Sequence, residues 1–231
     1  LKIPSPARHK ASMHGLPYRR LAGFYFFYFA YLGAFAPFFG LYLDHAGLSA
    51  VEIGSLMSLP QVTRIIAPHL WGWLADHSSS RLRVVRLTGL AGTLFYLGVF
   101  LGREFGLLFG VLFAMTFFWS AALPLVEATT LAHLGDETAR YGRIRVWGSI
   151  GFIVLVVGGG YALDHLGVAT VPAMVLLMML GMLGFAWSLP DARSTHAANE
   201  DTTIWQVMRR PETQALIIAS GFMAAAHGPY Y

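Results

Sequence analysis

Cysteine is absent from this 231-residue sequence, and charged residues make up only 12% of it. Without cysteine there are no disulfides, thiolate metal sites or cysteine nucleophiles. A soluble domain carries about 25% charged residues, and half of that leaves too little polar surface to cover a globule in water. Because 56% of the residues are hydrophobic and the mean hydropathy is +0.56, the chain is predicted to be a membrane protein.

A stripe of basic residues is also missing, although the formal net charge is +4. The basic residues form short clusters between apolar runs, which argues against nucleic acid as a partner. Fourteen of the 16 lie before the first run or in every second loop, Arg103 lies in an opposite loop, and Arg64 lies inside a run. Since loops rich in Lys and Arg stay in the cytoplasm, the N-terminus of a multi-pass inner (plasma) membrane protein is predicted to be cytoplasmic.

Six apolar runs are long enough to cross a bilayer as helices, which takes about 20 residues each. They are solidly apolar, whereas the strands of a membrane barrel would alternate. The predicted fold class is therefore an all-α membrane protein. Its predicted spans are 21–43, 51–74, 84–102, 105–131, 146–163 and 168–189, with a partial seventh at 213–231.

The longest polar connection divides the chain into parts. It holds Asn199, Glu200 and Asp201 and has a proline near each end. We expect this sequence to be a piece of a longer protein. Its expected parts are a cytoplasmic N-terminal segment at 1–20, a six-helix transmembrane bundle at 21–189, a cytoplasmic linker at 190–212, and a truncated seventh helix at 213–231.

The loop between the second and third runs reads Gly72-Trp-Leu-Ala-Asp76-His-Ser-Ser-Ser-Arg81. This pattern resembles the loop 2–3 signature of the major facilitator superfamily. The resemblance implies a gating loop, with Gly72, Asp76 and Arg81, that latches two halves of a transporter on the cytoplasmic side. The glycine permits close backbone packing, and the aspartate can sit against a helix N-terminus and neighbouring arginines. Serine replaces the usual turn glycine and His77 the usual basic residue, so we expect a weaker latch.

Two further stretches sharpen the resemblance. They read Pro124-Leu-Val-Glu127-Ala and Tyr141-Gly-Arg143-Ile-Arg145-Val-Trp147-Gly148-Ser149-Ile-Gly151-Phe152. They are similar to the oligosaccharide:proton symporters of the lactose permease type, and closer to the 3-phenylpropionate transporter-like permeases. Arg64 and the segment from Ala226 to Tyr231 also resemble the latter group. The resemblance implies twelve helices in two bundles, of which this chain holds the N-terminal bundle and the start of helix seven.

Arg64 is the most informative residue from physics alone, because it falls near the middle of the second run. An arginine at the centre of a membrane helix costs about 2.5–3.5 kcal/mol on insertion scales. It therefore needs a partner or a wet cavity. Two readings stay open: its guanidinium receives an anionic substrate group, or it forms a fixed ion pair with a glutamate of the bundle.

Glu127 and Arg145 belong to successive helices, so any contact between them is tertiary. The resemblance implies that both bind substrate in a central cavity, with Glu127 accepting hydrogen bonds from substrate hydroxyls or holding Arg145 ready for an anion. Glu127 is also a candidate for proton coupling. The alternative is an interfacial ion pair near the cytoplasmic ends, which would contribute little.

Aromatic and histidine side chains supply further candidates. Tyr28 and Tyr31, in an aromatic stripe on the first helix, are candidate substrate contacts, although packing against neighbouring helices is favoured. His69 and His227 titrate near neutral pH, and His227 is a proton-coupling candidate because it matches the helix-seven pattern; a structural role is favoured for both. Gly148 and Gly151 are expected to allow close helix contact.

The sequence therefore predicts a secondary transporter, with proton-coupled symport of a small organic acid such as a phenylpropionate-like aromatic acid. The alternatives are a proton-coupled sugar or nucleoside symporter and a non-transporting receptor or assembly partner. The expected partners are the substrate, protons, the lipid bilayer and the missing C-terminal bundle of the same polypeptide. No enzyme activity, catalytic residue, metal or cofactor is expected, since neither a His-Glu-x-x-His helix nor a phosphate loop is present.

Overall fold

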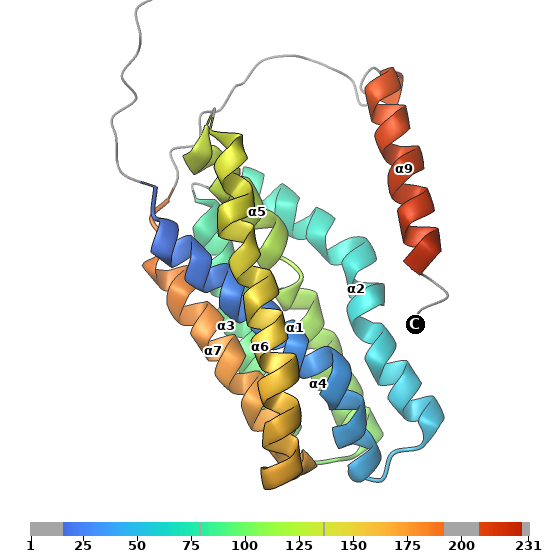
Figure 1. The fold of residues 1–231 in the computed structure, drawn as a ribbon. Helices are drawn as coiled ribbons and strands as arrows, with labels where there is room; N and C mark the ends of the chain where they lie inside the picture. Colours follow the sequence, from blue (N-terminus) through green and yellow to red (C-terminus); the bar gives the residue numbers. More distant parts are fainter. Residues whose placement is uncertain (1–15, 79, 136, 192–207, 228–231) are drawn as a thin grey trace, which may run out of the picture. The chain divides into compact units, whose positions relative to one another are not determined.

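A computed structural model describes residues 16–78, 80–135, 137–191 and 208–227, and the described chain is helical with short connections (Figure 1). The predicted segment 1–20 and the linker 190–212 lie largely outside these residues. The chain separates into two units, Leu1–Arg193 and Ser194–Tyr231. The helices are α1 (Tyr18–His45), α2 (Ala50–Asp76), α3 (Arg81–Tyr96) with η1 (Leu97–Phe100), α4 (Phe105–Trp119), α5 (Ala122–Leu134), η2 (Thr138–Arg140), α6 (Tyr141–Leu166), η3 (Val168–Thr170), α7 (Val171–Ser188) and, in the second unit, α9 (Pro211–His227).

Long apolar helices confirm most of the predicted spans. Among the described residues, five stretches are long and apolar enough to cross a membrane: Tyr18–His45, Arg81–Phe100, Phe105–Leu134, Tyr141–Leu166 and Val168–Ser188. Two predicted spans fall outside this group. The span 51–74 corresponds to α2, which has 27 residues, and the partial span 213–231 corresponds to α9, which has 17. The polar positions of α2, among them Gln61 and Arg64, lower its hydropathy. Such a helix needs protein or water along its polar side.

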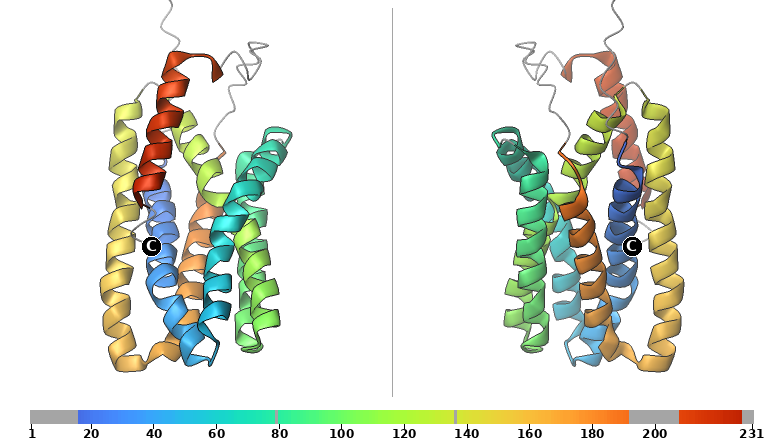
Figure 2. Two further views of the ribbon diagram at one scale, coloured as in Figure 1. Left: turned by 90° about the vertical axis from the view of Figure 1, so that its right-hand side faces the viewer. Right: turned by 90° about the vertical axis from the view of Figure 1, so that its left-hand side faces the viewer.

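The first helix forms the centre of the bundle and packs mainly against α6 and α7. Figure 2 shows α6 running along one side of the bundle over its full height. A Cβ atom added to Gly151 of α6 would overlap the backbone of Phe26, and one at Gly33 of α1 would lie 2.7 Å from the Phe152 carbonyl oxygen. At Gly148 an added Cβ would lie 2.6 Å from the ring of Phe29. The predicted packing role of the glycines on α6 is therefore confirmed.

A bend separates α4 from α5, where the sequence had predicted one continuous helix at 105–131. Pro124 has no N–H to donate to the carbonyl four residues earlier, that of Ser120, and its ring would crowd that carbonyl. The helix breaks at Ser120 and Ala121. The freed carbonyl of Phe117 accepts hydrogen bonds from Trp71 Nε1 at 2.9 Å and Ser120 Oγ at 2.8 Å.

Arginines tie the helices together at one end of the bundle, where α1, α3 and α6 begin. We call this the basic end; it is the predicted cytoplasmic end. Arg20 of α1 donates to the Ser188 carbonyl at 2.8 Å, and Arg86 of α3 donates to the Leu189 carbonyl at 2.6 Å. These guanidinium groups satisfy backbone acceptors that the end of α7 leaves without helical partners.

Candidate functional site

The structure brings together Glu127 of α5 and Arg145 of α6, as the sequence predicted. Arg145 Nε lies 3.6 Å from Glu127 Oε1. The same oxygen accepts a hydrogen bond of 3.1 Å from the hydroxyl of Tyr141. Tyr141 and Arg145 are four residues apart on α6 and therefore share one face of it. Tyr141 was not among the predicted site residues, although its spacing from Arg145 was a usable signal.

Aromatic rings hold the guanidinium of Arg145 in place. Its Cζ lies 4.0 Å from the ring centre of Phe29 and 5.7 Å from that of Tyr25, both on α1. Such cation–π contacts stabilise the charge of the guanidinium. The hydroxyl of Tyr25 is in turn hydrogen-bonded to Thr130 Oγ1 at 3.2 Å, which links α1 to α5.

The guanidinium nevertheless keeps its hydrogen-bonding capacity. Its 3.6 Å contact with Glu127 is an ion pair but is too long for a hydrogen bond. No other described residue accepts a hydrogen bond from it. The side chains of Arg145 and Glu127 are 32% and 34% exposed, so a small solute can reach them within this unit. The donors of Arg145 are therefore available to a ligand.

Arg64 forms no ion pair and no hydrogen bond with any residue that the structure describes. Its side chain is exposed within the first unit. The charges of Arg64, Glu127 and Arg145 all act on the hydroxyl of Tyr28. All three charged residues therefore lie within electrostatic reach of α1. The fixed ion pair that was the alternative for Arg64 is not seen within the described residues.

The charged residues lie at different depths along their helices. Arg64 is close to the middle of α2, 14 residues from its start and 12 from its end. Glu127 is seven residues from the end of α5, or about 10 Å from the basic end of the helix. Arg145 is four residues, about 6 Å, from the start of α6. The Glu127–Arg145 pair therefore lies in the half of the bundle nearer the basic end.

Tyr28 and Tyr31 lie in a packed aromatic cluster around Trp119. Tyr28 is 8% exposed and stacks on Trp119, with ring centres 6.0 Å apart. Tyr31 is 3% exposed and lies 4.8 Å from the same indole, with its hydroxyl directed at Met115 Sδ. Both side chains are therefore mostly packed against neighbouring helices, which was the alternative to substrate contact. Only the Tyr28 hydroxyl is near the charged residues, and substrate contact by either tyrosine stays a prediction.

The predicted gating loop is partly assembled. Arg81 Nη2 lies 3.0 Å from Asp76 Oδ1, and Ser80 Oγ donates to Asp191 Oδ1 at 2.6 Å. The latter contact joins the start of α3 to the chain after α7. A Cβ at Gly72 would meet nothing within 4 Å among the described residues, so the expected close packing there stays a prediction. His77 bonds the Trp73 carbonyl of its own helix at 2.8 Å.

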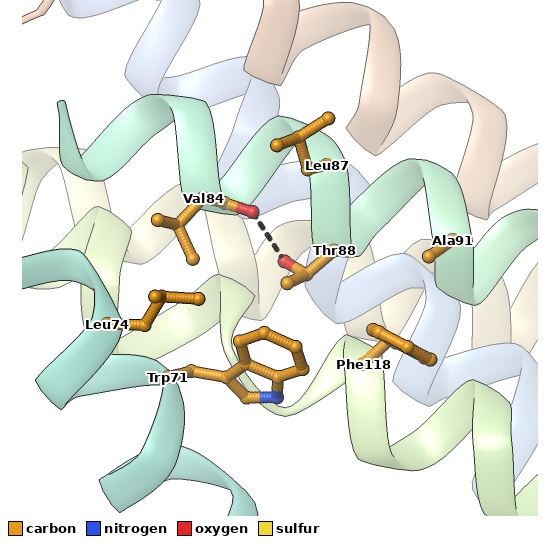
Figure 3. Close-up of a pocket in the computed structure, with 7 residues that line it drawn as sticks. All are labelled: Trp71, Leu74, Val84, Leu87, Thr88, Ala91 and Phe118. Atoms are coloured by element: carbon orange, nitrogen blue, oxygen red, sulfur yellow. Dashed lines mark hydrogen bonds between the residues drawn. The ribbon is translucent and has the colours of Figure 1, made fainter. Parts of the chain in front are cut away.

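An apolar pocket of about 250 Å³ lies between α2, α3 and the end of α4 (Figure 3). Thr88 is its one hydroxyl-bearing residue, and that hydroxyl already donates to the Val84 carbonyl at 2.8 Å. The charged residues of the site do not line the pocket, so it offers no recognition group for a polar substrate. Its lining residues are Trp71, Leu74, Val84, Leu87, Thr88, Ala91 and Phe118.

Histidines add nothing to the site within the described residues. His69 is exposed on α2, and the side chain of His227 lies outside the part of the chain that the structure describes. Its predicted role in proton coupling therefore stays a prediction. No group of three or more metal-ligating side chains occurs among the described residues.

Comparison with known proteins gives consistent matches. Residues 18–231 match the model of the MFS_1 like family. The chain is 32% identical over 168 residues to a maltose permease of Geobacillus stearothermophilus, covering 72% of this chain and 43% of that protein. It is 26% identical over 217 residues to a probable 3-phenylpropionic acid transporter of Escherichia coli (strain K12), covering 92% of this chain and 57% of that protein.

The fold matches a solved structure, the crystal structure of nucleoside transporter NupG. The TM-score is 0.66 at 21% identity, covering 90% of this chain and 52% of that one. At this identity the likeness establishes the fold alone. This chain spans about half the length of the relatives that it matches.

Proposed function

Since the chain belongs to the MFS_1 like family, we propose that it supplies the first bundle of a secondary transporter of the major facilitator type. In such a transporter two bundles rock about a site near the middle of the membrane. The first unit provides one bundle with a charged side. The second bundle, expected in the same polypeptide and beginning with α9, would close the site from the other side.

The proposed substrate is a small organic anion, and one observation carries this choice. Arg145 is seated between aromatic rings without a hydrogen-bond acceptor among the described residues, and Arg64 has no ionic partner there either. With Glu127 ionised, two positive charges face one negative charge. A carboxylate can accept two parallel hydrogen bonds from a guanidinium, which a neutral solute cannot match. The relative described as a probable 3-phenylpropionic acid transporter agrees with this class.

Proton coupling follows because Glu127 and the substrate carboxylate would both bind the guanidinium of Arg145. When a substrate carboxylate binds this guanidinium, Glu127 loses its counter-charge. It then takes up one proton, so that one proton and one carboxylate cross together without net charge. On release the proton leaves Glu127, and the ion pair with Arg145 forms again.

A sugar or nucleoside is the second candidate substrate. The Glu127 carboxylate accepts one hydrogen bond, from Tyr141, and a carboxylate has room for several more from sugar hydroxyls. Relatives described as a maltose permease and a putative nucleoside transporter, the latter from Escherichia coli (strain K12), support this class. A receptor that binds without transport is the candidate from another class, and it predicts substrate binding with no uptake.

The test is uptake by the full-length protein in proteoliposomes with an imposed proton gradient, using 3-phenylpropionate, maltose and uridine. We expect 3-phenylpropionate to be taken up. Arg145→Lys loses the forked guanidinium and should raise the KM for the acid about tenfold or more, the value of a charge-assisted hydrogen bond.

Arg140→Lys is the matched control for this substitution. Arg140 is an exposed arginine of η2, before the start of α6, and its Nη1 is paired with Glu137 at 2.8 Å. Its KM should stay within about twofold of the wild type, as for a surface ion pair. Uptake of maltose or uridine but not of the acid would transfer the proposal to the second candidate. An unchanged KM in Arg145→Lys would remove this arginine from the site.

A further inference from the structure

We propose that α3 and α7 form a binding site for an anionic phospholipid at the basic end. Its phosphate is held by Arg20, Arg83 and Arg86 beside Trp187, and its acyl chains lie along the exposed apolar sides of the two helices. This inference requires only that the chain spans a membrane. It does not depend on transport or on the charged residues of the candidate functional site.

Two arginines converge on the last residues of α7. Arg20 Nη1 donates to the Ser188 carbonyl at 2.8 Å. Arg86 donates to the Ala186 carbonyl from Nε at 3.2 Å and to the Leu189 carbonyl from Nη2 at 2.6 Å. These bonds fix the position of both guanidinium groups. Because a guanidinium has five N–H donors, each group keeps donors that no described residue accepts.

Arg83 adds a third positive charge to this cluster. It lies three residues before Arg86 on α3, and residues at this spacing are neighbours on a helix surface. Its side chain is exposed and forms no ion pair or hydrogen bond with any described residue. The structure therefore leaves this guanidinium available to a ligand.

Few negative charges offset the three arginines among the described residues. Asp191, just after α7, accepts a hydrogen bond from Ser80 Oγ at 2.6 Å, and Asp76 is paired with Arg81 at 3.0 Å. The end of α7 contributes about half a negative charge through its last carbonyl groups. The cluster is therefore positive overall. A phosphate diester carries one negative charge and several acceptor oxygens, which complement the guanidinium groups.

The cluster lies at the ends of two membrane-spanning stretches. Arg83 is the third residue of the stretch Arg81–Phe100, and Trp187 is the second-last residue of Val168–Ser188. Trp187 is 58% exposed, and Arg86 Cζ lies 5.9 Å from its ring centre. Tryptophan is enriched at the level of lipid headgroups, and basic pockets between membrane helices bind anionic headgroups. The position of the cluster therefore suits a phospholipid.

An apolar surface for acyl chains begins next to the cluster. The helices α3 and α7 pack against each other (Figure 1). On α3, exposed leucines follow Arg83 at spacings of 4, 7 and 11 residues, which places them on one side of the helix. On α7, an exposed leucine lies seven residues, or about two turns, before Trp187. A soluble phosphate would make no use of this surface. The leucines are Leu87, Leu90, Leu94 and Leu180.

The experiment follows thermal unfolding of the purified full-length protein in detergent while lipid is titrated in. Phosphatidylglycerol carries a net negative charge, whereas phosphatidylcholine with the same acyl chains carries none. We expect phosphatidylglycerol to raise the unfolding temperature at lower concentration, because a ligand of the folded state stabilises it. The soluble anion sn-glycerol 3-phosphate should not stabilise. Equal stabilisation by this anion would identify the ligand as a free phosphate and overturn the lipid assignment.

Arg83→Gln removes one charge of the cluster without breaking a described contact. One basic residue near the membrane surface changes the affinity for an anionic lipid about fivefold. The phosphatidylglycerol concentration that gives half of the stabilisation should therefore rise about fivefold. Arg83→Met is a second uncharged variant and should show the same rise if the glutamine variant does not accumulate.

Arg143→Gln is the matched control. Arg143 is exposed near the start of α6, also at the basic end, and α6 packs mainly against α1. Loss of the same charge there should leave the half-point within about twofold of the wild type. An equal rise in both variants would mean diffuse attraction to the basic end and would overturn the site. Equal stabilisation of the wild type by the two lipids would also overturn it, because the face would then be covered by protein or neutral lipid.

Discussion

Two tryptophans of the bundle use their indole N–H groups differently. Trp71 Nε1 donates to the Phe117 carbonyl at the α4–α5 bend, at 2.9 Å. Trp119 Nε1 is buried and has no hydrogen-bond partner among the described residues, although its rings pack on Tyr28 and Tyr31. A buried donor without an acceptor costs about 1–3 kcal/mol. Ring packing, not hydrogen bonding, therefore holds Trp119.

Substituting each tryptophan by phenylalanine should distinguish the two cases. Trp119→Phe removes an unsatisfied donor and keeps an aromatic ring, so the loss of packing is offset and the free energy of unfolding should change by less than about 1 kcal/mol. Trp71→Phe leaves the Phe117 carbonyl with one donor fewer and should destabilise by about 1 kcal/mol or more. Thermal unfolding of the purified protein in detergent measures both. Equal losses of stability would contradict this account of Trp119.

The Glu127–Arg145 contact was predictable, but its geometry was not. The two residues lie close to a short turn between successive helices, which limits how far apart they can be. Their predicted role in substrate binding rested on the resemblance of the surrounding motifs to those of the lactose permease type. The hydrogen bond from Tyr141 depends on how α6 begins after η2, and the aromatic seat of Arg145 comes from α1, more than 100 residues earlier. Such distant contacts are not encoded in any local pattern.

The helices themselves were predictable because long apolar runs have few alternatives in lipid. The break at Ser120 and Ala121 was the main departure. Proline alone did not signal it, because Pro37, Pro60 and Pro68 lie inside continuous helices. Arg64 is one of the polar residues that lower the hydropathy of α2, and the same polarity made it a candidate site residue in the sequence. Which side of α2 carries Arg64 depends on packing against α4, and the sequence alone could not supply it.

The close contact between α1 and α6 requires a residue without a side chain at Gly151. A methyl group at Gly151 would overlap the Phe26 backbone, which cannot rotate away as a side chain would. Gly151→Ala should therefore destabilise the bundle by about 1–3 kcal/mol, the usual range for overpacking. Gly158→Ala on the same helix is the control, because a Cβ there meets nothing within 4 Å. Denaturation of the two variants in parallel checks the prediction; equal stability would mean that the helices separate readily at Gly151.

The whole bundle has a predicted orientation that single cysteines can test, since the chain has none of its own. In a cysteine-free background of the full-length protein, Arg103→Cys should react with a membrane-impermeant maleimide added to intact cells. Arg140→Cys, at the basic end, should react only after the membrane is opened. The positive-inside bias is the physical reason. The opposite labelling pattern would invert the orientation and place Tyr141 and Glu127 nearer the outer surface.

The backbone contact between α1 and α6 also bears on how the proposed transporter would move. Where two helices touch through main-chain atoms, no side chains lie between them that could rearrange. The two helices would therefore tilt together as one rigid body. Arg145 on α6 and Phe29 on α1 belong to this rigid pair of helices, so the guanidinium would keep its contact with the Phe29 ring during the motion. The intrinsic affinity of Arg145 for an anion would then be the same whether the site faces the cytoplasm or the outside.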